Sequence, residues 1–366
     1  MTKQNQNINS ALNVQKGIEQ PLSLNKDSIL KFKQNKKSLL SVDDYSKGIL
    51  QGNLTVLSRA ITLIESSLPS HFDIAQAVIE KCLPFSGKSI RIGITGVPGV
   101  GKSTFIEALG KILTNKGHKV AVLAIDPSSQ ISRGSILGDK TRMEELSNDP
   151  NAFIRPSPNA GSLGGVARKT KESIILCEAA GFDVIFIETV GVGQSETAVN
   201  AMVDFFLLLM LAGAGDELQG IKRGIMEMAD AIIINKADGD NIQKAKNAKM
   251  DYSNALHLFP PKTSGWIPKT EICSALSKKG IEDCWDIIQE HHQQLKSNNY
   301  FEQKRKEQAK QRMLEMVSDK LKDDFFRDSE VSKLLPKLEK KLLQNKISSY
   351  VAAQQLLDIY FKVSSI

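Results

Sequence analysis

Residues 96–104 read GVPGVGKST, which fits the phosphate-binding pattern G-x-x-x-x-G-K-[ST]. The apolar run RIGIT (91–95) precedes this stretch, and the helical pattern FIEALGKIL (105–113) follows it. Glycines at this spacing let backbone N–H groups converge on phosphate oxygens, while Lys102 reaches the terminal phosphates and the Ser103 hydroxyl ligates Mg²⁺. The strand-loop-helix context disfavours an ordinary glycine-rich turn. The predicted phosphate site comprises Gly96, Val97, Pro98, Gly99, Val100, Gly101, Lys102, Ser103 and Thr104.

Outward from this loop, short β-branched runs alternate with longer helix-compatible segments. The further runs are KVAVLAID (119–126), DVIFIET (183–189), FFLLLML (205–211) and AIIIN (231–235). Alternation of this kind indicates a mainly parallel sheet with helices on both faces. The predicted fold class is therefore α/β, of the P-loop NTPase type, with helical segments before and after the sheet.

Four regions follow from composition and periodicity. Residues 1–40 are rich in Asn, Gln, Ser and Lys and are predicted to be a disordered basic tail. Residues 41–88 carry apolar positions at helical spacing, residues 89–297 hold the nucleotide-binding domain, and residues 298–366 contain no strand candidate. In this last region the pattern leaves open docking on the main domain or pairing with a second copy. Its helical stripes are Leu314, Val317, Leu321 and Phe325, then Leu334, Leu338 and Leu342.

The net charge of +7 belongs to the two ends of the chain. Residues 1–40 hold seven Lys against two acids, and residues 296–346 hold fourteen Lys and Arg against nine acids, so each is +5. Solvated helix faces with a tail are favoured over a surface for nucleic acid or an anionic membrane, and we expect neither partner. Four scattered cysteines favour reduced thiols, and with no apolar leader before residue 16 the expected location is cytoplasmic. The longest apolar run, 205–215, is too short to span a bilayer.

The stretch NKAD at 235–238 follows a predicted buried strand. In P-loop proteins Asn-Lys-x-Asp at this place selects guanine, because the Asp carboxylate accepts from N1–H and the exocyclic amine of the base, which adenine does not offer in that arrangement. GTP is therefore favoured over ATP. Asn235, Lys236 and Asp238 are the predicted base-selecting residues. A companion loop is expected at 273–276, with the Ala275 backbone N–H facing the guanine oxygen, and its predicted members are Ser274, Ala275 and Leu276.

Acidic residues follow two of the predicted strands. Asp126 ends one strand, Asp139 lies in a Gly/Ser-rich stretch beyond it, and Glu188 ends the strand 183–189. Ligands of open α/β sheets gather at the carboxyl ends of strands, so these acids, with Lys102 and the metal ligand Ser103, are the predicted catalytic and magnesium-binding set. Val192 stands where small Ras-like GTPases carry a water-orienting glutamine, which predicts a hydrolytic site that is incomplete by itself.

Residues 213–230 read GAGDELQGIKRGIMEMAD and follow the apolar run 205–211. This polar cluster is consistent with a solvated helix start. Beside the carboxyl edge of the sheet, it also fits a third switch element that reports on the phosphates or meets a partner. Its candidate residues are Asp216, Gln219 and Lys222.

The ordered strings GVPGVGKST, LAIDPSS, GSILGDKTRM, IETVGVGQSE, GAGDELQGIKRG and NKAD resemble the MeaB/ArgK/MMAA family of SIMIBI-class P-loop GTPases. The resemblance covers roughly residues 42–290. It implies a GTPase chaperone that gates adenosylcobalamin loading and protects or reactivates an acyl-CoA mutase, chiefly methylmalonyl-CoA mutase. GTP or GDP and Mg²⁺ would be the cofactors, whereas adenosylcobalamin belongs to the mutase. It also implies hydrolysis stimulated by the mutase through residues 216–222, and a homodimer formed by the helical arm 298–366.

Two departures from the family pattern stand out. Arg133 replaces one glycine of the usual Thr-Gly-Gly-Ser string, and Met210-Leu211-Ala212 lacks the proline often found there. Three other interpretations remain: a protein kinase of a periplasmic amino-acid transport system, as the older ArgK assignment has it; a metal-insertion GTPase; and a nucleic-acid-binding module. NKAD disfavours ATP-dependent phosphorylation. Five His, of which only His291 and His292 form a pair, and four dispersed Cys disfavour metal transfer.

Overall fold

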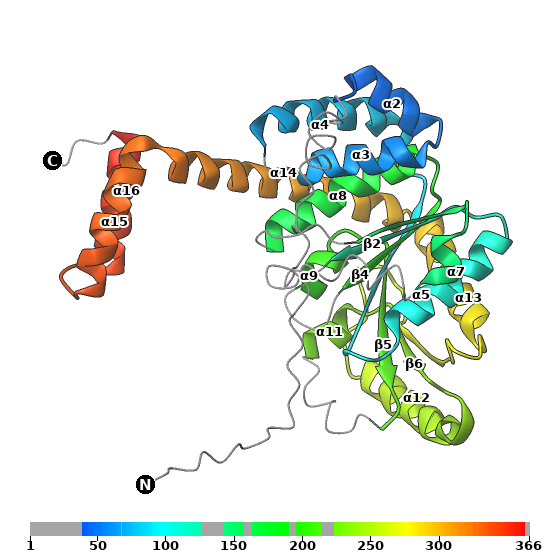
Figure 1. The fold of residues 1–366 in the computed structure, drawn as a ribbon. Helices are drawn as coiled ribbons and strands as arrows, with labels where there is room; N and C mark the ends of the chain where they lie inside the picture. Colours follow the sequence, from blue (N-terminus) through cyan, green and yellow to red (C-terminus); the bar gives the residue numbers. More distant parts are fainter. Residues whose placement is uncertain are drawn as a thin grey trace, which may run out of the picture. The chain divides into compact units, whose positions relative to one another are not determined.

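The computed structural model describes residues 39–66, 68–125, 143–156, 163–189, 195–213 and 223–362. Their centre is a seven-stranded sheet in the order β3-β2-β4-β1-β5-β6-β7, in which every neighbouring pair is parallel (Figure 1). The predicted parallel sheet is thus confirmed. Its strands are β1 (Ile90–Gly96), β2 (Val120–Ile125), β3 (Ala152–Arg155), β4 (Val184–Thr189), β5 (Phe205–Leu211), β6 (Ala231–Asn235) and β7 (Lys269–Ile272).

The five predicted strands are the central ones. β2, β4 and β6 are buried along their whole length, which explains their near-continuous apolar sequence, because a parallel strand is covered on both faces. The register pairs Ile94 of β1 with Glu188 of β4 and with Leu207 of β5. The end of β1, which leads into the phosphate loop, therefore lies between the ends of β4 and β5.

The two edge strands, β3 and β7, had no prediction. Each has four residues, and no residue of β7 is fully buried. The sequence of β7, KTEI, offers only one apolar side chain, because this strand has a neighbour on one side only. Ion pairs of Lys249 with Glu271 and of Lys269 with Glu290 surround β7 with charge, which discourages pairing of the open edge with another chain.

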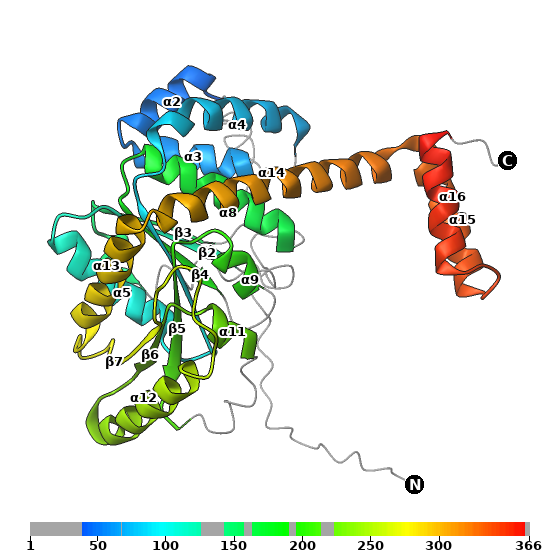
Figure 2. The same ribbon diagram turned by 180° about the vertical axis from the view of Figure 1, so that it is seen from behind.

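Helices cover both faces of the sheet, as predicted. α5 and α13 lie on one side, and α8, α9 and α11 lie on the other (Figures 1 and 2). α12 packs against β6 and β7. The bounds of these and the minor helices are α5 (Lys102–Asn115), α7 (Glu144–Ser147), α8 (Leu163–Ala179), α9 (Ser195–Asn200), α11 (Arg223–Met228), η2 (Gly239–Asn241), α12 (Ile242–Leu256) and α13 (Ile281–Ser297).

The predicted N-terminal helical segment forms three helices, α2 (Val42–Leu50), α3 (Leu54–Glu65) and α4 (Pro69–Cys82), followed by η1 (Leu83–Phe85). Asn53 caps α3 by accepting from the N–H groups of Thr55 and Val56. α3 and α4 both pack on α8. Ile49 of α2 and Leu57 and Ile61 of α3 are fully buried, so the helical spacing found in the sequence marks the inner face of these helices.

Three helices follow the sheet domain: α14 (Tyr300–Arg327), α15 (Ser329–Leu343) and α16 (Ser349–Phe361). The first half of α14 is held by polar contacts. The Arg305 guanidinium donates to both carboxylate oxygens of the buried Asp204 at 3.0 and 2.7 Å. Lys304 donates to the backbone carbonyl of Asp204, and Gln308 to that of Val203, each at 2.9 Å. This segment of α14 therefore docks on the residues that connect α9 to β5.

The second half of α14 leads to a hairpin of α15 and α16 with its own small core. Val331 and Leu338 of α15 pack with Ala352 and Leu356 of α16, and Phe325 of α14 joins them. Three residues of the apolar stripe predicted on this helix remain exposed to solvent: Leu314 is 50% exposed, Val317 52% and Leu321 60%. Of this stripe, Phe325 packs against other residues of the chain, whereas the three residues before it do not become buried.

The structure also bears on membrane spans and on the state of the cysteines. No helix among the described residues combines the length and apolarity needed to cross a bilayer. All four cysteines, Cys82, Cys177, Cys273 and Cys284, are buried free thiols.

His291 of α13 is an ionisable side chain placed in an apolar site. It is 3% exposed and stands edge-on to the rings of Phe205 and Trp266, each at 5.0 Å. Burial lowers the pKa of His291 to about 4, against an opposing effect of Asp230. Burial raises the pKa of Asp230, but the charges of Lys262, Lys304 and His291 outweigh this effect, so the pKa of Asp230 is lowered from its usual value.

The stability of the fold should depend on the neutral form of His291. Since its pKa is lower in the folded state than the usual 6.5, the unfolded state binds the proton first as the pH falls. Stability from this residue is complete above pH 6.5 and is lost between about pH 6.5 and 4, with about 2 kcal/mol gone by pH 5. Urea unfolding at pH 7 and pH 5 measures this.

His291→Gln should flatten that pH dependence even though it lowers stability at both pH values. His257→Gln is the matched control, because His257 is exposed at the end of α12. An equal loss between pH 7 and 5 in wild type and His291→Gln would contradict the assignment.

Candidate nucleotide site

The phosphate loop connects β1 to α5 through a backbone that requires glycine. Gly96, Gly99 and Gly101 have φ values of 152°, 78° and 94°, which L side chains rarely adopt. A Cβ on Gly96 would stand 2.3 Å from the carbonyl oxygen of Leu209, and one on Gly101 would stand 2.9 Å from the Asn235 amide nitrogen. Gly96 and Gly101 are therefore required for two reasons: the backbone conformation of the turn, and the lack of space for a Cβ beside Leu209 and Asn235.

Lys102 opens α5 and lies against the loop. It is 8% exposed, and its ammonium donates to the carbonyls of Gly96 at 2.8 Å and Val97 at 3.4 Å. Burial lowers the pKa of Lys102, while the carboxylates of Glu188 and Glu196 oppose the shift. The first N–H groups of α5 have no intrahelical partner, so the ammonium and the helix start together form an anion-binding surface.

Ser103 and Glu188 meet beside this loop. The Ser103 hydroxyl donates to Oε1 of Glu188 at 3.0 Å, and Glu188 is buried at the end of β4. Hydroxyl and carboxylate oxygens are hard donors of the kind Mg²⁺ prefers. The residues present therefore suit a magnesium ion, although the described residues contain no group of three His, Cys, Asp or Glu side chains that by itself would hold a metal.

Two features beside Glu188 were not singled out in the sequence. Thr189 donates from its hydroxyl to the hydroxyl of Thr95 at 2.9 Å, and both side chains are fully buried. This bond ties the end of β4 to β1 directly before the phosphate loop. Glu196, in the first turn of α9, is fully buried and acts on Lys102. Both lie within the string IETVGVGQSE, but no motif gives either residue a role, and only their burial in the fold reveals them.

Asn235 connects two loops. Its side-chain amide nitrogen donates to the carbonyl of Val100 at 2.8 Å, and its amide oxygen accepts from the backbone N–H of Ala275 at 3.1 Å. The residue is 1% exposed. The predicted guanine motif is therefore in contact with the phosphate loop on one side and with the 273–276 loop on the other.

Asp238 and Ser274 also join the two predicted base-recognition segments, because the Ser274 hydroxyl donates to the Asp238 carboxylate. Lys236 is exposed and has a φ of 60°, an uncommon conformation for a non-glycine residue. Leu276 is exposed at the rim of the loop, whereas Ala275 is buried. The residues at 235–238 and 274–276 thus converge at one end of the sheet.

Five predicted residues lie outside the described part of the chain. These are Asp126 and Asp139 of the acidic set and Asp216, Gln219 and Lys222 of the proposed third switch. The departure at Arg133 lies there too. The described residues on either side end at Ile125 of β2 and Gly213 after β5, both at the carboxyl edge of the sheet.

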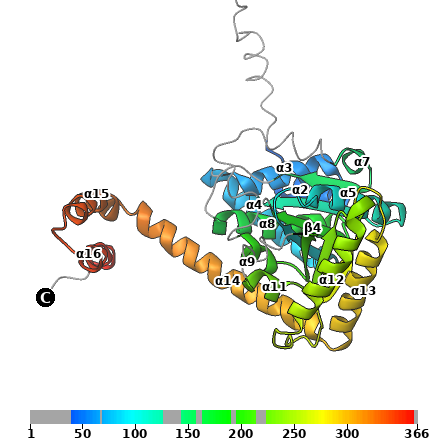
Figure 3. The same ribbon diagram turned by 90° about the horizontal axis from the view of Figure 1, so that it is seen from below.

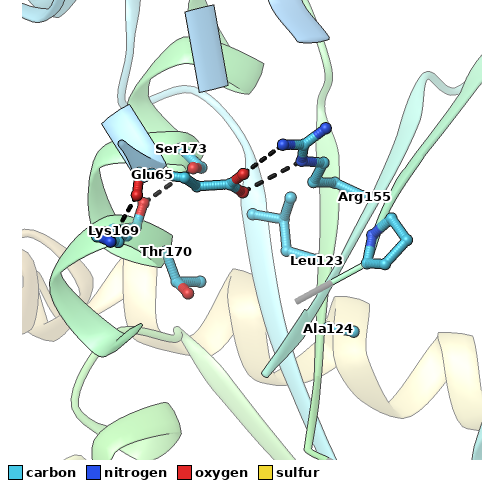
Figure 4. A pocket seen from close by; sticks show the side chains of 8 residues that line it. Glu65, Leu123, Ala124, Arg155, Lys169, Thr170 and Ser173 are labelled. Carbon is cyan, nitrogen blue, oxygen red and sulfur yellow. Dashed lines mark hydrogen bonds and ion pairs between the residues drawn. The ribbon is translucent and has the colours of Figure 1, made fainter. Parts of the chain in front are cut away.

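A small cavity lies beside the end of β2, between α3, β3 and α8 (Figure 4). The Arg155 guanidinium pairs with the Glu65 carboxylate in two hydrogen bonds, and Lys169 donates to the Glu65 carbonyl at 2.7 Å. The cavity measures about 10 Å³, room for a single water and not for a nucleotide. These contacts fix α3 next to the strand that leads to Asp126.

A parallel sheet whose first strand enters a glycine-turned phosphate loop, with a base-recognition motif after β6, defines a P-loop nucleotide-binding protein. Residues 57–330 match the family described as methylmalonyl Co-A mutase-associated GTPase MeaB. The chain therefore belongs to this GTPase family, which confirms the resemblance found in the sequence and the predicted class of enzyme. Membership implies binding of a guanine nucleotide.

Comparison with individual proteins gives the same family assignment. A probable GTPase of Mycobacterium tuberculosis is 48% identical over 319 residues, which cover 87% of this chain and 95% of the relative. The methylmalonic aciduria type A homolog of Mus musculus is 45% identical, covering 87% and 79%. A crystal structure of an LAO/AO transport system kinase superposes with a TM-score of 0.70 at 35% identity, covering 88% of this chain and 99% of that one.

Removal of the Asn235 side chain should destabilise the fold. Asn235→Ala leaves the buried carbonyl of Val100 and the N–H of Ala275 without their partner, so the free energy of unfolding should fall by about 2–4 kcal/mol. Urea unfolding of the nucleotide-free protein measures this. Asn247→Ala, on the exposed face of α12, is the matched control and should stay within about 0.5 kcal/mol of wild type. Equal stability of the two variants would refute the bridging role.

Proposed function

We propose that this protein is a GTP-hydrolysing chaperone of an adenosylcobalamin-dependent acyl-CoA mutase. It gates loading of the cofactor onto the mutase and protects or reactivates that enzyme. The observation that carries the proposal is the match of residues 57–330 to a family described as mutase-associated. The 45% identity to a methylmalonic aciduria type A homolog supports methylmalonyl-CoA mutase as the client.

In this proposal GTP binds along the carboxyl edge of the sheet. Residues 96–104 hold the phosphates, with Lys102 at the terminal ones. Asn235, Lys236 and Asp238 select guanine, together with Ser274, Ala275 and Leu276. The convergence of the 235–238 and 274–276 segments through Ser274 and Asp238 supports the base site. Mg²⁺ is held by Ser103 and Glu188, with Asp126 and Asp139 completing the acidic set.

Hydrolysis in the isolated protein is proposed to be slow. Glu188 orders the metal shell or the attacking water, and Val192 offers no polar group at the place of the usual glutamine. The partner completes the site through Asp216, Gln219 and Lys222. The contact of Glu188 with Ser103 supports the first of these roles, since it brings the carboxylate to the start of α5.

The proposed organisation has a basic tail at 1–40, an N-terminal helical segment at 41–88, a GTPase domain at 89–297 and a dimerisation arm at 298–366. The exposed apolar residues Leu314, Val317 and Leu321 on α14 support pairing of the arm with a second copy. Adenosylcobalamin belongs to the mutase, and neither nucleic acid nor membrane is a proposed partner. The four free thiols support a cytoplasmic location.

A protein kinase of a transport system is the second candidate. It is favoured by the similarity of this chain to the crystal structure of an LAO/AO transport system kinase. The two functions differ in nucleotide and in the fate of the phosphate: a kinase transfers it to a protein acceptor, whereas the chaperone releases it to water.

The mutase should accelerate GTP hydrolysis. We expect the rate of phosphate release to rise by about tenfold or more when the candidate mutase is added, a barrier change of about 1.4 kcal/mol. ATP in place of GTP is the control and should give little hydrolysis. An unchanged rate with bound mutase would refute the gating proposal, and radiolabel appearing in a transport protein instead of free phosphate would favour the kinase.

Asp238→Asn should change the preferred base. The amide replaces one acceptor with a donor, which mismatches guanine and suits xanthine, so affinity for GTP should fall about a hundredfold or more relative to xanthosine triphosphate. Fluorescent-nucleotide displacement measures both affinities. Asp240→Asn, an exposed acid two residues further on, is the matched control. Equal weakening of both nucleotides would contradict the guanine assignment.

A further inference from the structure

Two buried hydroxyl groups meet at the carboxyl ends of neighbouring strands. Thr95 is the residue of β1 directly before Gly96, and Thr189 is the last residue of β4. The Thr189 hydroxyl donates to the Thr95 hydroxyl at 2.9 Å, and both residues are 0% exposed. The register of the strands accounts for this contact, because β1 and β4 are paired one residue earlier, at Ile94 and Glu188.

The hydroxyl pair and the Glu188 carboxylate lie on opposite faces of the sheet. Successive side chains of a strand alternate between the faces, and Glu188 accepts a hydrogen bond from the start of α5. On the other face, α9 packs against β1 and β4 (Figures 1 and 3). A Cβ on Gly93, on the same face of β1 as Thr95, would stand 2.7 Å from the Val199 side chain of α9. Thr189 therefore holds the end of β4 from the face opposite to the one that meets α5.

The stability of the fold does not by itself require two hydroxyls at this place. Apart from Thr95, Thr189 and Glu188, the buried side chains of β1 and β4 are apolar. Replacement of both partners of a buried hydrogen bond by apolar groups of the same shape can be neutral or stabilising. Two valines would lack the short approach, because the hydroxyl oxygens stand 2.9 Å apart whereas carbon atoms in contact keep about 3.5–4.0 Å. The pair is therefore explained by the position that it gives to the end of β4.

We propose that Thr95 and Thr189 are a positioning pair for GTP hydrolysis. Their bond fixes the distance between the end of β4 and the residue that precedes the phosphate loop, and so it places Glu188 beside Ser103. A displacement of about 1 Å in an active site can lower the rate about a hundredfold. The inference rests on the proposed role of Glu188 at the metal shell or the attacking water. Neither threonine is assigned a contact with the nucleotide.

The test compares Thr189→Val, Thr189→Ser and the double variant Thr95→Val/Thr189→Val with wild type in the full-length chain. Single-turnover GTP hydrolysis with Mg²⁺, GDP affinity and the urea midpoint are measured for each. Thr189→Val should hydrolyse GTP about tenfold or more slowly. Its GDP affinity should stay within about threefold, because residues 96–104 and 235–238 keep their own contacts. Thr189→Ser retains the hydroxyl and should stay within about threefold of the wild-type rate.

The double variant separates positioning from stability. It removes both members of the bond, so its urea midpoint should return toward that of wild type. Its hydrolysis rate should remain about tenfold low, because the valine methyl groups do not approach each other as closely as the two oxygens do. Recovery of the rate together with the midpoint would show that the pair only stabilises the fold, and would overturn the inference.

Thr170→Val is the matched control. Thr170 of α8 is a buried threonine whose hydroxyl bonds within its own helix, to the Val166 carbonyl at 3.0 Å. Its replacement should leave hydrolysis within about twofold of wild type. The inference is wrong if Thr170→Val slows hydrolysis as much as Thr189→Val does, or if Thr189→Ser is as slow as Thr189→Val.

Glu188→Gln separates the inference from the role on which it rests. If this variant hydrolyses GTP at the wild-type rate, the proposed role of Glu188 falls and the inference falls with it. If Glu188→Gln is slow and Thr189→Val is not, only the inference falls and the role of Glu188 stands. No mutase is present in these assays, so the result does not depend on the identity of the client.

Discussion

The carboxamide of Asn235 holds together two loops, the glycine-rich loop after β1 and the loop after β7. One end bonds to Val100 in the phosphate loop and the other to Ala275 in the loop after β7. Gly101 lies so close that any side chain there would meet the same amide. Because the amide is buried and bonds both loops, at 2.8 and 3.1 Å, one residue at the end of β6 fixes the spacing between them. A motif residue assigned to base selection thus also has a structural role.

The sequence predicted the inner strands of the sheet and the loop after β1, but not the edge strands. The phosphate loop was found from its glycine and lysine pattern, and the five inner strands were found because parallel strands covered on both faces leave continuous apolar runs. β3 and β7 were missed because short edge strands such as KTEI have no such run. The Thr95–Thr189 bond and the burial of Glu196 depend on register between strands far apart in the chain, which no local pattern reports.

The C-terminal helices combine two arrangements that the sequence presented as alternatives. Periodicity left docking on the main domain and pairing with a second copy equally open. The polar contacts of Lys304, Arg305 and Gln308 dock the first half of α14, although none of these residues belongs to an apolar stripe. Leu314 and Leu321 remain exposed further along the same helix. Charge fixes the start of the arm, and its apolar stripe stays available for another chain, so a pattern based on hydrophobicity alone describes only half of the helix.

These features meet on the short stretch from α9 to β5. Its start adjoins the segment 190–194 and includes Glu196, whose charge opposes the lowering of the pKa of Lys102, and its end at Asp204 is held by Arg305. An ion pair buried at one end makes that end the stable reference, since breaking it would leave an uncompensated charge. α9 thus lies between the segment 190–194 and an end that is fixed to α14.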